Sequence, residues 1–176
     1  MTDSLAGTAF EGSRFRAATE WFVAGEYEGA RVFEVGATAE RTADLLYALS
    51  VHLDPAVDVR IVVSRTGRGW QGALLALPEV RAELGRLRQA LAGYGGVEVA
   101  VFSPTDQLTL TPALQLVIYA RTDRWAYLLA GLGFDERAEA PARVWDPAAV
   151  PRAPLPPLEA ALEITAQRLG LVEFHA

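Results

Sequence analysis

A strand-like run that ends abruptly in arginine, glycine and tryptophan most strongly constrains how this chain can fold. Residues 57–63 alternate between β-branched apolar side chains and charged ones, which is typical of a strand with one apolar face. The residues that follow are Ser64-Arg65-Thr66-Gly67-Arg68-Gly69-Trp70-Gln71-Gly72. We interpret the whole stretch as a buried strand, a cationic glycine-rich loop that carries a tryptophan, and a connection into a helix that begins near Pro78.

A second segment repeats part of this pattern. The apolar run 117–120 leads into Arg121-Thr122-Asp123-Arg124-Trp125, so Arg-Thr-x-Arg and a nearby tryptophan recur. An arginine presents fixed, paired donors to a phosphate or carboxylate, and a tryptophan can stack on a ring or on another arginine. If both segments reach one cleft, they would form a site for an anionic ligand. The candidate residues are Arg65, Thr66, Gly67, Arg68, Gly69, Trp70, Arg121, Arg124 and Trp125.

A purely structural role explains the same residues without a ligand. Each arginine would pair with an acidic side chain nearby, and each tryptophan would fill space between a helix and the sheet. Tryptophan is mostly buried in folded proteins and surface arginine is common, so the pattern also fits this alternative.

The sequence pattern of residues 67–72 is similar to the G-x-G-x-x-G loop of dinucleotide-binding folds. In those folds the glycines let backbone N–H groups approach a pyrophosphate at a helix N-terminus. The resemblance covers only this loop, and the family also places an acidic residue about 20 positions further on, at the end of the next strand. Here Ser103 and Asp106 lie beyond that place and Glu98 lies at the start of the strand. We therefore predict no cofactor.

The composition excludes several kinds of chemistry. All 16 cationic residues are arginine, and the chain has no lysine, asparagine or cysteine. Lysine-dependent phosphate loops, Schiff bases, thiolate nucleophiles and cysteine metal sites are therefore absent. His52 and His175 are the only histidines, so we predict no metal site. A net charge of -6 argues against binding to nucleic acid or to anionic membranes.

The remaining pattern predicts an α/β or α+β fold, with a mixed sheet of about five to six strands flanked by helices. Residues 14–24 could form a helix, but glycines at 25 and 29 favour a hairpin of 19–23 with 30–35. Further helices are expected over 39–53 (capped by Thr38) and 78–92, and a third is capped by Thr122 or Asp123 and ends near Gly131 or Gly133. Strands are expected over 97–101, 107–111 and 114–120. Pro112 suggests that its segment lies at an edge or a bulge.

Composition also divides the chain. Residues 1–140 are predicted to form one core domain, and 141–157 a proline-rich, extended connector. Residues 158–176 would form a C-terminal arm, a helix and a last strand, packed on the core or on a second copy in a homodimer. We see no signal peptide and no run of about 18 apolar residues, so we expect a cytoplasmic protein outside the membrane.

Because the chain has few residues of the types that carry out catalysis, we predict a non-enzymatic binding or adaptor module with an anion-accepting Arg/Trp loop. A second hypothesis is a small enzyme that acts on a nucleotide or another phosphorylated substrate at the same loop. It would need Asp106, Asp123 or Asp135 close to Arg65 and Arg68. A third is an accessory or inhibitor protein that binds another protein through the acidic N-terminal third, where Glu26 and Glu28 lie.

Overall fold

The computed structural model describes residues 20–141 and 156–176. In these residues a nine-stranded sheet runs in the order β8-β1-β2-β7-β6-β5-β3-β4-β9. All neighbouring strands are antiparallel except β1 and β8, which are parallel, so the sheet is mixed. The predicted fold class is confirmed, but the number of strands was underestimated.

The strands are β1 (Trp21–Tyr27), β2 (Ala30–Gly36), β3 (Ala56–Val63), β4 (Arg68–Ala76), β5 (Val97–Phe102), β6 (Asp106–Leu110), β7 (Leu116–Ala120), β8 (Asp135–Arg137) and β9 (Val172–His175). The N-terminal hairpin forms as the flanking glycines indicated, and the part of the alternative helix before residue 20 lies outside the described residues. The largest difference is β4, because the predicted glycine-rich loop is mostly a strand.

The α-helices are α2 (Ala39–Leu49), α3 (Leu77–Tyr94), α4 (Arg124–Gly131) and α5 (Pro156–Leu169), and a 3-10 turn, η1 (Ser50–His52), follows α2. Thr38 caps α2 as predicted, since its hydroxyl accepts a hydrogen bond from the backbone N–H of Arg41. Pro78 lies in the first turn of α3, where its missing N–H removes no helical hydrogen bond.

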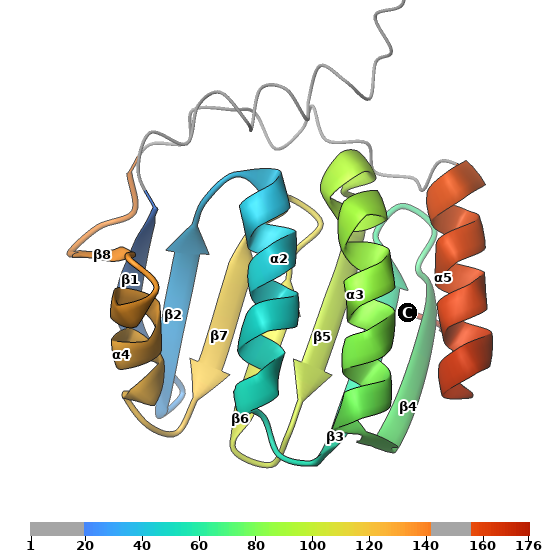
Figure 1. Ribbon diagram of the computed structural model, residues 1–176, viewed down its shortest axis with the longest axis horizontal. Helices are drawn as coiled ribbons and strands as arrows, with labels where there is room; N and C mark the ends of the chain where they lie inside the picture. The colour runs from blue at the N-terminus through green and yellow to red at the C-terminus, as the bar shows by residue number, and fades with distance from the viewer. Residues whose placement is uncertain (1–19, 142–155) are drawn as a thin grey trace, which may run out of the picture.

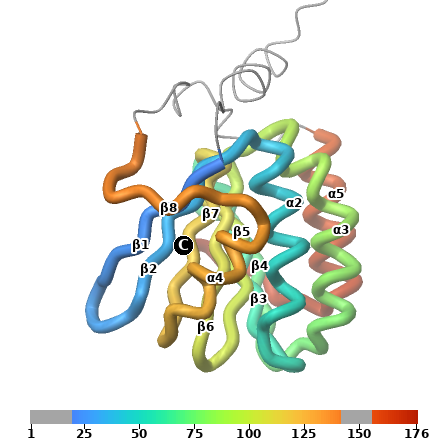
Figure 2. The backbone as a smooth tube through the Cα atoms, turned by 60° about the vertical axis from the view of Figure 1, so that its left-hand side comes forward, coloured from blue at the N-terminus to red at the C-terminus, as the bar shows by residue number. Residues whose placement is uncertain are grey.

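The four helices lie on one face of the sheet (Figures 1 and 2). The core lies between these two layers, where alternate strand residues are buried against the helices. Examples are Phe33, Ile61, Val99 and Ile118, each no more than 1% exposed. We call the opposite side of the sheet the open face, because no described helix lies on it (Figure 2).

The interpretation of Pro112 was wrong. It follows β6, which lies inside the sheet between β5 and β7 rather than at an edge. Pro112 itself belongs to the turn into β7, and its carbonyl accepts a hydrogen bond from the N–H of Gly96 at 2.8 Å. Because Pro112 lies in a turn, its missing N–H interrupts no strand pairing, and the segment can lie in the middle of the sheet.

The C-terminal arm covers one end of the helical layer. Helix α5 contacts α3 and β4, and β9 pairs with β4 at the edge of the sheet. Leu158 and Leu162 are completely buried in this contact. Most of the predicted proline-rich connector, residues 142–155, lies outside the described residues. No helix in the described ranges is long and apolar enough to cross a membrane.

Candidate functional site

The three glycines of the G-x-G-x-x-G stretch have structural roles in a hairpin. Gly67 has a φ of +69° in the turn from β3 to β4. Gly69 lies inside β4, where a Cβ would be 2.7 Å from the Ile61 carbonyl oxygen and 2.7 Å from the Phe174 ring. A Cβ on Gly72 would meet Leu171 at 2.6 Å. The stretch leads into a strand, not into a helix N-terminus, so it does not have the geometry of a pyrophosphate loop.

Gly69→Ala is expected to destabilise the fold by about 1–3 kcal/mol, because the Ile61 carbonyl belongs to the neighbouring strand and can move little. Urea denaturation followed by circular dichroism measures the change in the free energy of unfolding. Gly25→Ala is the matched control, since nothing lies within 4 Å of a Cβ there. Equal stability of the two variants would contradict the close packing at Gly69.

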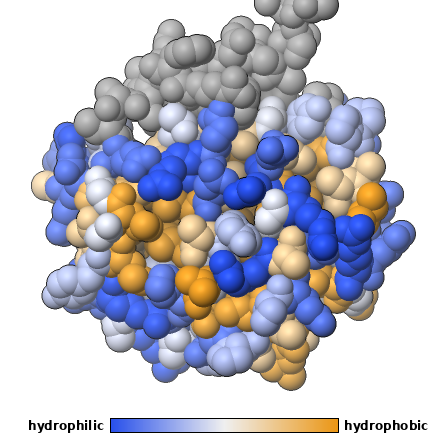
Figure 3. Space-filling model, in the orientation of Figure 1, coloured by the Kyte–Doolittle hydropathy of each residue, from blue (hydrophilic) through white to orange (hydrophobic). Residues whose placement is uncertain are grey.

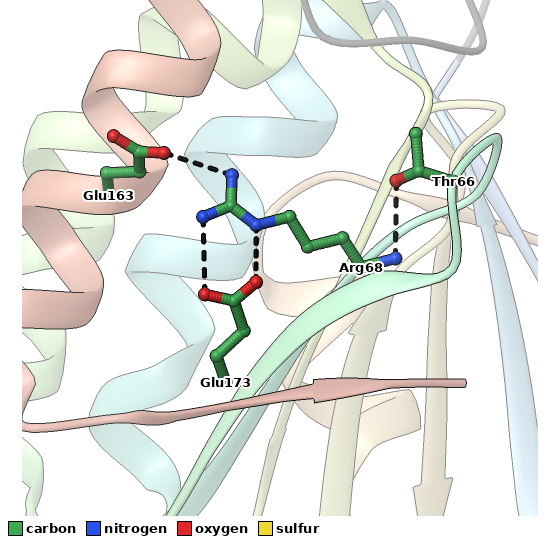
Figure 4. Close-up of polar contacts among 4 residues, drawn as sticks. All are labelled: Thr66, Arg68, Glu163 and Glu173. Atoms are coloured by element: carbon green, nitrogen blue, oxygen red, sulfur yellow. Dashed lines mark hydrogen bonds and ion pairs between the residues drawn. The ribbon is translucent and has the colours of Figure 1, made fainter.

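Arg68 is held by two carboxylates of the C-terminal arm. Figure 4 shows its guanidinium between Glu163 of α5 and Glu173 of β9, and the Nη1–Oε1 distance to Glu163 is 3.0 Å. The contact with Glu173 is bidentate, with Nε–Oε1 at 2.7 Å and Nη2–Oε2 at 3.3 Å. Hydrogen bonding to Glu173 and then Glu163 raises the pKa of Arg68, and Arg68 lowers the pKa of Glu173. The guanidinium also stacks over Trp70, 4.7 Å from the ring centroid.

This arrangement ties the arm to the hairpin. Trp70 is 5% exposed and belongs to the core beneath Arg68. Thr66 lies in the turn, where its hydroxyl accepts a hydrogen bond from the N–H of Arg68 (Figure 4). An incoming anion would have to displace carboxylates that already use the donors of Arg68. The local geometry is therefore that of a structural contact.

The second segment forms a network around Asp106. This carboxylate, on a residue only 5% exposed, accepts hydrogen bonds from Thr105 Oγ1, Arg124 Nη2 and Trp125 Nε1, each at 2.7 Å. Arg124 Nη2 also donates to the His52 carbonyl at 2.8 Å. The network joins α4 to β6 and to the end of η1, and Trp125 is completely buried.

The two halves of the predicted site do not meet. The turn that carries Arg65 follows Val63, which pairs with Val97, whereas Ala120, just before Arg121, pairs with Asp106. These pairs lie at opposite ends of the sheet, because β3 and β7 run in opposite directions with β5 and β6 between them. Arg65 and Arg121 are exposed at these two ends. One anion could not contact both segments.

The carboxylates proposed for an enzyme are not assembled around Arg65 and Arg68. Asp106 lies in the network at the other end of the sheet, and Asp123 forms an ion pair with Arg31 at 2.6 Å. Asp135 belongs to β8, the edge strand farthest from β4 and β9. In residues 20–141 and 156–176, no three His, Asp or Glu side chains cluster closely enough to hold a metal ion.

The structure adds a surface that the sequence analysis did not single out: a groove on the open face over β1, β2 and β7. It has a volume of about 350 Å³ and is lined by Val23, Gly25, Glu26, Tyr27, Val32, Glu34, Val117 and Tyr119. We call these residues the groove. Its signal in the sequence is that β1, β2 and β7 carry apolar residues at successive positions, so both faces of these strands are apolar.

Register explains why a hollow forms there. Val23 lies opposite Glu34, and Glu34 lies opposite Val117. In the next row, Gly25 lies opposite Val32, and Val32 lies opposite Tyr119. A Cβ at Gly25 would have nothing within 4 Å, so the missing side chain leaves space in this row. Tyr27, 61% exposed, follows on the same face of β1.

A second groove lies over the helical layer and differs in character. It has a volume of about 240 Å³ and is lined by Glu40, Asp44, Arg88, Gln89 and Ala92. Asp44 and Arg88 already form an ion pair across it, at 3.4 Å. Figure 3 shows hydrophilic side chains over much of this helical face. The groove on the open face therefore has the more apolar lining.

No protein-family model, curated protein or solved structure gives a significant match to this chain.

Proposed function

We propose that this chain is a non-enzymatic adaptor module that binds another protein through the open face of its sheet. One observation carries the proposal: the described helices lie on a single face, and the other face has an apolar groove of about 350 Å³. Apolar concave surfaces that the fold itself does not cover are typical of protein-binding sites. Six of the eight groove residues lie in the acidic N-terminal third, where the sequence suggested a protein partner, and the other two belong to β7.

Other ligands fit the open face less well. A single-stranded nucleic acid could stack on Tyr27 and Tyr119, but it would meet Glu34 and a net charge of -6. A small anion would meet the same negative charge. Of the arginines first considered for an anion, Arg68 and Arg124 bind carboxylates within the fold. Arg65 and Arg121 are exposed at opposite ends of the sheet, so they cannot bind one anion together.

The predicted homodimer through the C-terminal arm is not part of this proposal. In the described structure Leu158, Leu162 and Leu169 of the arm are buried, and their helix α5 contacts α3 and β4 of the same chain. A cytoplasmic location stays a prediction from the sequence.

Selection of peptides from a phage-displayed library of random 12-residue sequences tests the proposal. We expect the selected peptides to bind wild-type protein and to lose about tenfold or more in affinity for Gly25→Leu, because the new side chain fills the groove. Gly131→Leu is the matched control, since it adds the same side chain at a position that is also open but lies at the end of α4. Fluorescence anisotropy of labelled peptides measures the affinities.

Two results would overturn the proposal. One is a library that yields no binding peptide. The other is a set of peptides that bind Gly25→Leu as tightly as they bind wild type. Thermal unfolding of both variants, compared with wild type, shows that each protein remains folded.

A further inference from the structure

We propose that the groove selects a protein segment in which a lysine or arginine is flanked by apolar residues, with the cation bound beside Glu34. This inference rests on the proposed function and specifies the partner. It follows from the positions of the charged, aromatic and apolar side chains along the register of β1, β2 and β7.

Glu34 occupies the middle of the groove. It lies on β2 between Val23 of β1 and Val117 of β7, so its carboxylate is flanked by apolar side chains on both sides. Gln115 donates a long hydrogen bond of 3.4 Å to Glu34 Oε2. In the part of the chain that the structure describes, Glu34 has no ion-pair partner, whereas Glu26 is paired with Arg31 at 3.3 Å. Glu34 is therefore the carboxylate available to a cation from a partner.

Two tyrosines extend the preference for a cation. Tyr119 lies opposite Val32, which places it diagonally across from Glu34 on the same face of the sheet. Tyr27 lies at the other side of the groove, beyond the space at Gly25. Tyrosine faces attract ammonium and guanidinium groups, and they also pack against the methylene stems of lysine and arginine. A neutral or acidic segment would gain neither this attraction nor the ion pair.

The apolar lining of the groove favours apolar residues on both sides of the cation in the bound segment. Val23, Val32 and Val117 can be covered only by apolar side chains without burying an unpaired polar group. The acidic body adds long-range attraction, because a net charge of -6 steers basic segments toward the surface. A basic residue with apolar neighbours meets each of these features.

The test uses the peptides selected on wild-type protein. We expect a lysine or arginine at a fixed position between apolar residues. Replacing it with methionine should weaken binding to wild type about two- to fivefold, the range for an exposed ion pair. The same replacement should have a smaller effect on binding to Glu34→Gln, because the ion pair is already gone and only the tyrosines and the net negative charge still attract the cation. Glu98→Gln is the matched control, since it removes an acid from the open face on β5, outside the groove.

The outcomes separate this inference from the proposed function. Peptides that are sensitive to Gly25→Leu but lack a basic residue would overturn the inference and leave the proposed function standing. So would a basic residue whose replacement has the same effect in wild type and Glu34→Gln. Peptides insensitive to Gly25→Leu would overturn both. Equal loss of binding in Glu98→Gln and Glu34→Gln would show general attraction to an acidic surface and would also overturn the inference.

Discussion

Removal of residues 156–176 is expected to abolish cooperative folding or to lower the free energy of unfolding by at least about 5 kcal/mol. Leu158 and Leu162 are completely buried and Leu169 is 8% exposed, and each buried leucine contributes about 1.5–3 kcal/mol. The total is comparable with the whole stability of a typical domain, about 5–15 kcal/mol. Deletion would also take Thr165 and Arg168 away from Glu83, a residue only 4% exposed.

Urea denaturation of the chain that ends at residue 155 measures this effect. Point variants in the full-length chain measure how much the packing of single side chains of the arm contributes to the free energy of unfolding. Leu162→Ala should cost about 2–5 kcal/mol, whereas Ile164→Ala, on the same helix but 45% exposed, should cost under about 1 kcal/mol. A truncated chain that unfolds at the wild-type urea midpoint would show that the arm does not stabilise the core.

Asp106→Ala is expected to destabilise the fold by about 2–4 kcal/mol, mainly because a buried donor loses its acceptor, with up to about 1 kcal/mol from the ion pair to Arg124, whose side chain is 45% exposed. The substitution leaves the Trp125 Nε1–H, which belongs to a completely buried side chain, without its acceptor. It also removes the carboxylate that pairs with Arg124. The loss should loosen α4 from β6, since the network joins these elements.

The matched control for this prediction is Asp123→Ala. Asp123 forms an ion pair with Arg31, but its side chain is 61% exposed, so the cost should be no more than about 1 kcal/mol. Chemical denaturation monitored by tryptophan fluorescence compares the two variants. If Asp106→Ala costs no more than Asp123→Ala, the Asp106 network does not stabilise the fold.

Most of the elements could be predicted from local patterns, and the errors had particular causes. Thr38 identified the start of α2, and the alternation over 57–63 identified β3, because a cap and a one-faced strand depend only on nearby residues. Residues 68–76 resembled a loop because glycine is frequent in turns. In β4 the glycines have a different role, because their missing side chains let Ile61, Phe174 and Leu171 pack closely against the backbone of this strand. Two of those three residues are about 100 positions away in the sequence.

By itself, the sequence determined the class of fold, the chemistry that is absent and the residue types available for binding. These follow from composition and from periodicities a few residues long. Only the tertiary structure decided that Arg68 meets Glu163 and Glu173, that Arg124 and Trp125 meet Asp106, and that the two similar segments lie at opposite ends of the sheet.

The groove on the open face also depends on the tertiary structure. Val23, Glu34 and Val117 become neighbours through the pairing of β2 with both β1 and β7, and β7 is far away in the chain. Apolar residues on both faces of these strands are visible in the sequence, but which face the helices cover depends on how the whole chain packs. Strand order and the side on which helices lie are set by long-range contacts, and local patterns carry no record of them.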